Sequence, residues 1–165
     1  MFKLSAFIIS LLADLLNAQQ PLAPQKLTIR VQVVLSVPDT ITSQISNAMD
    51  RELRSLTDVE LVDKNPTYVI RVMGLPARIG KRVSGYALTF LTVEPLDPVA
   101  VDRVINVDIP MNMRTALKTY INGSERFLSQ QMRITPPDHI QDECREIVAN
   151  INAKLFEETR RRPRR

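Results

Sequence analysis

The sequence has few of the residues on which metal sites, disulfide frameworks and aromatic cores depend. Among its 165 residues there is one cysteine, Cys144, so the chain cannot form an intramolecular disulfide. There is one histidine, His139, and no cluster of cysteine and histidine at the spacing of a zinc site. Tryptophan is absent and aromatic residues make up 5% of the chain, so the core must consist mainly of Val, Ile and Leu. We expect no metal ion, no cofactor and no catalytic constellation.

Excess positive charge is confined to the end of the sequence. Of the net charge of +4, five units come from arginines among the last six residues, which leaves −1 for the rest of the chain. A nearly neutral body argues against a basic groove for nucleic acid on the fold itself. Residues 160–165 are predicted to be a disordered basic tail, either solvated or in contact with anionic lipid headgroups or other envelope polyanions. Nucleic acid is the least favoured partner, because the first residues indicate export. Since no aromatic residue accompanies the arginines, any contact with nucleic acid would be to phosphate alone. The tail arginines are Arg160, Arg161, Arg162, Arg164 and Arg165.

The first 18 residues have the pattern of an export signal. Lys3 supplies a short positive region, residues 4–16 are mostly apolar, and Ala18 is a small residue before a cleavage point. The apolar run is shorter than the roughly 20 residues that span a bilayer. We expect a signal peptide over residues 1–18, a mature chain of 147 residues beginning at Gln19, and a periplasmic or secreted location. The alternatives are an amphipathic first helix and an uncleaved anchor, because a charged residue interrupts the apolar run.

The rest of the chain predicts a two-layer α+β fold. Residues 40–56 and 138–158 carry apolar side chains at helical spacing, and each predicts an amphipathic helix. Residues 26–37 alternate between apolar and polar side chains, which is typical of a half-buried strand. Further strands are predicted at residues 58–63 and 68–73, as a hairpin, and at residues 85–94, 101–109 and 126–134, the last at a sheet edge; residues 110–123 suit a short helix.

The predicted organisation is a flexible leader over residues 19–25, a single α+β domain over residues 26–159 and the tail. In this domain, two main helices pack on a mostly antiparallel sheet of about five to six strands.

Two isolated residues, His139 and Cys144, are candidates for chemistry, but both fit structural roles better. His139 and Glu143 lie four residues apart in the last predicted helix, and two ligands do not make a stable metal site. No nucleophile is signalled near His139. Cys144 lies on the apolar stripe of the same helix, which predicts a buried thiol and not a reactive one.

Residues 74–84 combine glycine, proline and basic residues and are predicted to form a mobile loop between two strands. The segment lacks the ending of a phosphate-binding loop and does not join a strand to a helix. Arg78, Lys81 and Arg82 nevertheless make it the best candidate surface on the body for an anionic partner.

The order of segments resembles certain exported bacterial α/β modules. The helix that ends in RELRSLTDVELVD (residues 51–63) is followed by YVIRVMG (68–74) and GYALTFLTVE (85–94). This succession is similar to the amino-terminal domain of TolB and to the CsgG-like and penicillin-binding-protein-activator lipoproteins. The resemblance implies a module that binds envelope proteins and has no catalytic centre. It covers about half the chain and transfers no residue-level site, since the chain has no lipobox cysteine and no propeller repeat.

Together these features favour an exported, non-catalytic protein-binding module of the cell envelope. It would act through the sheet edge, residues 74–84 or the basic tail, with an envelope protein as partner and anionic lipid as a second contact of the tail. One alternative is a small hydrolase that uses dispersed carboxylates, namely Asp97, Asp102 and Asp108. Another is a membrane-surface protein that binds lipid through the arginine tail.

Overall fold

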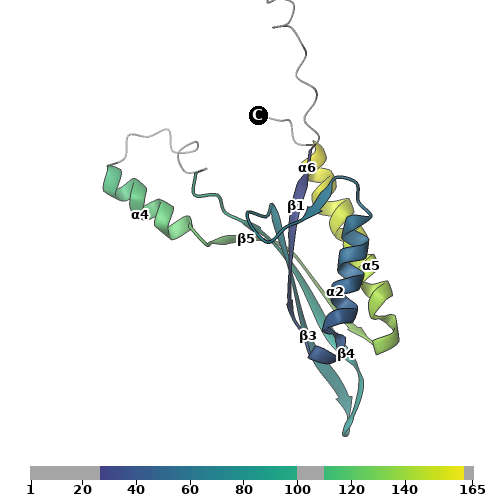
Figure 1. Cartoon of the computed structure of the whole chain (residues 1–165). Coiled ribbons are helices and arrows are strands. Elements are labelled where there is room, and N and C mark those ends of the chain that lie inside the picture. Colours follow the sequence, from purple (N-terminus) through teal and green to yellow (C-terminus); the bar gives the residue numbers. More distant parts are fainter. Residues whose placement is uncertain (1–26, 100–109, 162–165) are drawn as a thin grey trace, which may run out of the picture.

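The computed structural model describes residues 27–99 and 110–161, which form a mixed five-stranded sheet with helices packed on one face (Figure 1). The strands are β1 (Ile29–Ser36), β2 (Val59–Leu61), β3 (Tyr68–Ile79), β4 (Arg82–Pro95) and β5 (Glu125–Thr135), in the order β2-β1-β3-β4-β5. The helices are α2 (Asp39–Arg54), α4 (Met111–Ile121), α5 (Ile140–Ile151) and α6 (Glu157–Arg161); a 3-10 turn (Pro137–His139) precedes α5, and a π-helical turn (Asn152–Phe156) joins α5 to α6. The predicted α+β class is confirmed.

One hydrophobic core lies between the sheet and the two main helices, α2 and α5. The apolar stripes that predicted these helices face the sheet, and every second residue of β1, β3 and β4 meets them. Phe156 in the π-helical turn is fully buried, and its ring lies 5.5 Å from that of Tyr68. The helices contribute Ile41, Ile45, Met49, Leu53, Ile140, Cys144, Ile147 and Ile151, and the strands contribute Ile29, Val31, Ile70, Val72, Leu88 and Phe90.

The pairing of the strands corrects one prediction. Residues 58–63 and 68–73 do not form a hairpin: β2 and β3 lie on opposite sides of β1, and both run parallel to it. The two longest strand pairings, β3 with β4 and β4 with β5, are antiparallel. The local pattern of residues 58–73 could not reveal this arrangement, because the strand that pairs with both lies 30 residues before β2 and 37 residues before β3 in the pairing register.

The loop predicted at residues 74–84 is also wrong. The segment forms the end of β3 and the start of β4, which meet in a tight turn at Gly80 and Lys81. Gly80 has φ +63°, a conformation that glycine adopts without strain. Pro76 is tolerated in the strand because β1 ends beside Met73, so the proline faces a partner only on the β4 side.

Two predictions are confirmed at the other end of the sheet. Residues 110–123 contain α4, and β5 is an edge strand beside β4. The predicted signal peptide (1–18), the leader (19–25) and the strand at residues 101–109 lie outside the described residues. Among helices in the described part of the chain, none has the length and apolarity needed to cross a membrane.

Candidate protein-binding surface

The basic residues singled out in the sequence do not come together. Arg78, Lys81 and Arg82 are exposed at the tip of the β3–β4 hairpin, whereas α6, with Arg160 and Arg161, lies at the opposite end of the sheet (Figure 1). Arg162, Arg164 and Arg165 lie outside the described residues.

Arg160 is part of the fold and does not belong to a tail. Its guanidinium binds Asp58, with Nε and Nη2 lying 2.6 Å and 2.8 Å from the two carboxylate oxygens, and Nη1 binds Glu157 at 2.7 Å. The hydrogen bonds to Asp58 raise the pKa of Arg160. This bidentate contact ties α6 to the segment before β2, so the arginine run begins inside a helix.

The predicted burial of Cys144 is confirmed, and His139 lies in the turn before α5. His139 is exposed, and its Nε2 lies 3.8 Å from Asp138. Cys144 is fully buried between α5 and the sheet. Across residues 27–99 and 110–161, no three His, Cys, Asp or Glu side chains lie close enough together to hold a metal ion.

Burial couples the Cys144 thiol to stability at high pH. Desolvation, followed by the nearby carboxylates of Glu143 and Glu52, raises the pKa of Cys144 from its ordinary 9.0 to about 11. Between these values the unfolded chain loses the thiol proton and the folded chain retains it, so the free energy of unfolding falls as the pH rises. We expect Cys144→Ala to show a shallower fall between pH 9 and 11 in urea unfolding. Equal slopes for the two proteins would contradict the burial argument.

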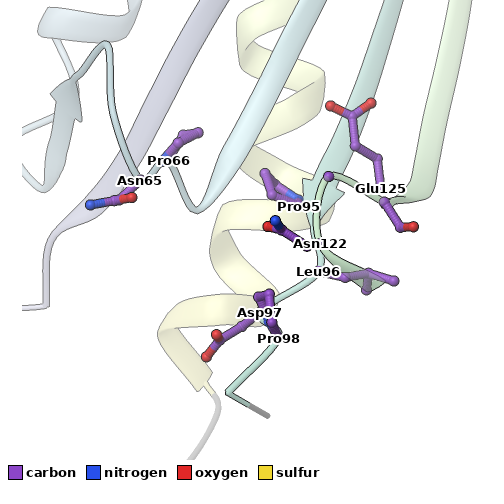
Figure 2. Close-up of a pocket in the computed structure, with 10 residues that line it drawn as sticks. Asn65, Pro66, Pro95, Leu96, Asp97, Pro98, Asn122 and Glu125 are labelled. Atoms are coloured by element: carbon purple, nitrogen blue, oxygen red, sulfur yellow. The ribbon is translucent and has the colours of Figure 1, made fainter. Parts of the chain in front are cut away.

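A shallow pocket lies where three loops meet beside the start of β5 (Figure 2). Its volume is about 450 Å³, and it holds Asp97, one of the three carboxylates proposed for a hydrolase. Asp97 accepts a hydrogen bond from the Val99 amide at 2.8 Å, and the other lining carboxylate, Glu125, lies 2.6 Å from Arg71. Both carboxylates are thus engaged in local contacts; Asp102 and Asp108 lie outside the described residues.

The sheet face opposite α2 and α5, here called the open face, carries an apolar patch. Val72 and Leu88 point into the core, so their neighbours Met73 and Ala87 point to the open face. Arg133 binds Glu146 on α5, so the flanking residues of β5 also point to the open face. The apolar patch comprises Met73, Leu75, Ala87, Met132 and Ile134.

Strand register places these side chains in two adjacent rows across the sheet. One row contains Ser36, Met73, Thr89 and Met132, and the next contains Leu75, Ala87 and Ile134. None of these residues is charged. Leu75, Met132 and Ile134 are 72%, 62% and 77% exposed. Contiguous apolar side chains exposed in this way mark interaction sites.

Sequence reasoning found half of this surface. It identified β5 as an edge strand, but it assigned Leu75 to a loop, and it looked for the binding residues among cations. The feature of the sequence that could have indicated the patch is the apolar character of β4 on both faces. A strand of this kind is typically covered on both sides of the sheet.

Comparison with known proteins gives matches among solved structures alone. No protein-family model matches the sequence, and no curated protein sequence matches it. The structure is similar to that of a PelC dodecamer from Paraburkholderia phytofirmans, with 12% identity and a TM-score of 0.41 over 78% of this chain and 86% of that one. It is also similar to a minor lipoprotein from Acinetobacter baumannii, with 12% identity and a TM-score of 0.30 over 74% and 92% of the two chains. Similarity at this level assigns no family, function or partner to the chain, and the resemblance to TolB-like modules stays a prediction.

Proposed function

We propose that the chain is an exported, non-catalytic protein-binding module of the cell envelope, and that it binds through the apolar patch of the open face. The observation that carries this proposal is the pair of uncharged rows in which Leu75, Met132 and Ile134 are mostly exposed. Covering these side chains removes apolar surface from water, which drives most protein association. Export rests on the signal pattern of residues 1–18.

Two neighbouring features extend the proposed surface. The outer edge of β5 has no strand beside it among the described residues, and such an edge can pair with an extended segment of a partner. The hairpin tip continues β3 and β4 beyond the patch and presents Arg78, Lys81 and Arg82 to an anionic part of a partner. A lipid-binding role for the tail would rest on the arginines after Arg160, because Arg160 is held by Asp58.

Photo-crosslinking tests this function directly. A benzophenone side chain is placed at Met132 or Ile134 on the open face, and at exposed Lys154 on the helical layer as a matched control. The full chain is produced in cells that export it, illuminated, and recovered from the periplasmic fraction. We expect discrete protein adducts from the two open-face positions and none from position 154.

Equal yields of adducts at all three positions would indicate nonspecific association and contradict the proposal. So would the absence of protein adducts at positions 132 and 134. The mass of each adduct also separates a second copy of the chain from a different protein.

A further inference from the structure

The apolar stripe of α4 is not buried against any other part of the described chain. It has no buried residue, and its apolar residues at helical spacing, Met113, Leu117, Tyr120 and Ile121, form one stripe. Tyr120 is 80% exposed. An isolated helix of 11 residues is marginal in water, because most helical stability in proteins comes from packing an apolar face. In the described part of the chain, α4 therefore buries no residue and the open face has no helix packed on it.

These two surfaces match in chemistry. Both rows of the apolar patch are free of charge, and the α4 stripe is apolar, with Arg114 and Lys118 to one side of it, where they can stay in water. Helix-on-sheet packing already covers the other face of the same sheet through α2 and α5. A helix seated on the open face would complete a three-layer arrangement.

The apolar patch lies too far along the sheet for α4 of the same chain to cover it. Three residues separate Ile121 from Glu125, and the Leu96 amide donates to the Ser124 carbonyl, which extends the β4–β5 pairing up to the helix. α4 points away from the sheet at this end (Figure 1). A helix of 11 residues is about 16 Å long. Ile134 lies about 30 Å along β5 from its start. Folded back on its own strand, α4 would end near Gln130 and leave the patch uncovered.

We propose that the apolar patch is occupied by α4 of a second copy of this chain. This inference rests on the proposed function and names its partner. The α4 stripe of one copy lies across Met132 and Ile134 of a neighbouring copy. The open face of the first copy is covered by α4 of another copy. Reciprocal exchange closes a dimer, and exchange in one direction around a ring closes a larger assembly.

Cysteine crosslinking between two tagged copies tests the inference. One full-length copy carries Tyr120→Cys in α4 and the other carries Ile134→Cys in the patch. The native Cys144 is fully buried and does not compete. We expect mild oxidation of the mixture to give a disulfide between the two tags, at least about tenfold more than either copy gives alone. Adding Met132→Glu to the patch copy is expected to abolish it, whereas Ala153→Glu, an exposed apolar position on the helical layer, is expected to leave it unchanged.

Three results of the cysteine experiment would overturn the inference. One is the absence of any disulfide between copies at concentrations where the purified chain is soluble. Another is a disulfide formed only within a single chain that carries both cysteines, since this places α4 on its own sheet. The third is a stronger crosslink between two Ile134→Cys copies, which indicates sheet against sheet. Photo-adducts of positions 132 and 134 with a different protein would preserve the proposed function while excluding the second copy as its partner.

Discussion

Replacing Phe156 by alanine is expected to lower the free energy of unfolding by about 3–5 kcal/mol, the range for deleting a buried aromatic ring. Phe156 is fully buried in the π-helical turn between α5 and α6, and its ring packs against Tyr68 of β3. Tyr68 in turn contacts Thr159 through its hydroxyl group. The substitution would leave a cavity where the last helical segment meets the sheet, so urea unfolding followed by circular dichroism measures the loss.

Phe127 supplies a matched control, because it is the same residue type at 59% exposure. Phe127→Ala is expected to change the free energy of unfolding by less than about 1 kcal/mol, as is usual for surface positions. Similar losses for the two variants would mean that residues 152–161 do not contribute to the core, and the packing described for Phe156 would be wrong.

The helical layer could be predicted because its signal is local. The stripe from Ile41 to Leu53 and the stripe from Ile140 to Ile151 each repeat at helical spacing within one segment, and both stripes face the core. The alternation of apolar and polar residues in β1 is likewise contained within one segment. In these elements one face is buried, and the apolar residues of that face repeat at the spacing of the helix or strand.

The order of the strands could not be predicted, because it depends on contacts between distant segments. Nothing within residues 58–73 indicates that β2 and β3 both pair with β1. Residues 74–84 predicted a loop because glycine and proline usually interrupt strands. At Gly74, inside β3, the glycine instead makes room for its neighbours: a Cβ atom there would lie 2.9 Å from Cδ2 of Leu88.

The candidate site was predicted least well. Charge is visible in composition, so the sequence directed attention to Arg78, Lys81, Arg82 and the final arginines. The apolar patch is assembled from three strands whose register is known only in the folded chain. An exposed Leu75 and a buried Val72 look alike in a sequence, and only the structure separates them.

The central claim is that the open face receives a helix from another copy, and it predicts a large effect on α4. Undocked, this 11-residue helix has no buried residue and should exchange its amide hydrogens at nearly the rate of an unfolded segment. Docked, it should exchange more slowly in proportion to the free energy of docking, with about a tenfold change for each 1.4 kcal/mol. Protection of α4 should therefore rise with protein concentration.

The most direct measurement is hydrogen–deuterium exchange of α4 in the full-length chain and in Met132→Glu, with Ala153→Glu on the helical layer as the control. The substitution lies on the sheet and the measured amides lie on the helix, so a change reports contact between the two. We predict that α4 of the native chain and of Ala153→Glu gains at least about tenfold protection when the protein concentration is raised, and that α4 of Met132→Glu gains none. Equal exchange of α4 in all three proteins at every concentration would contradict the account.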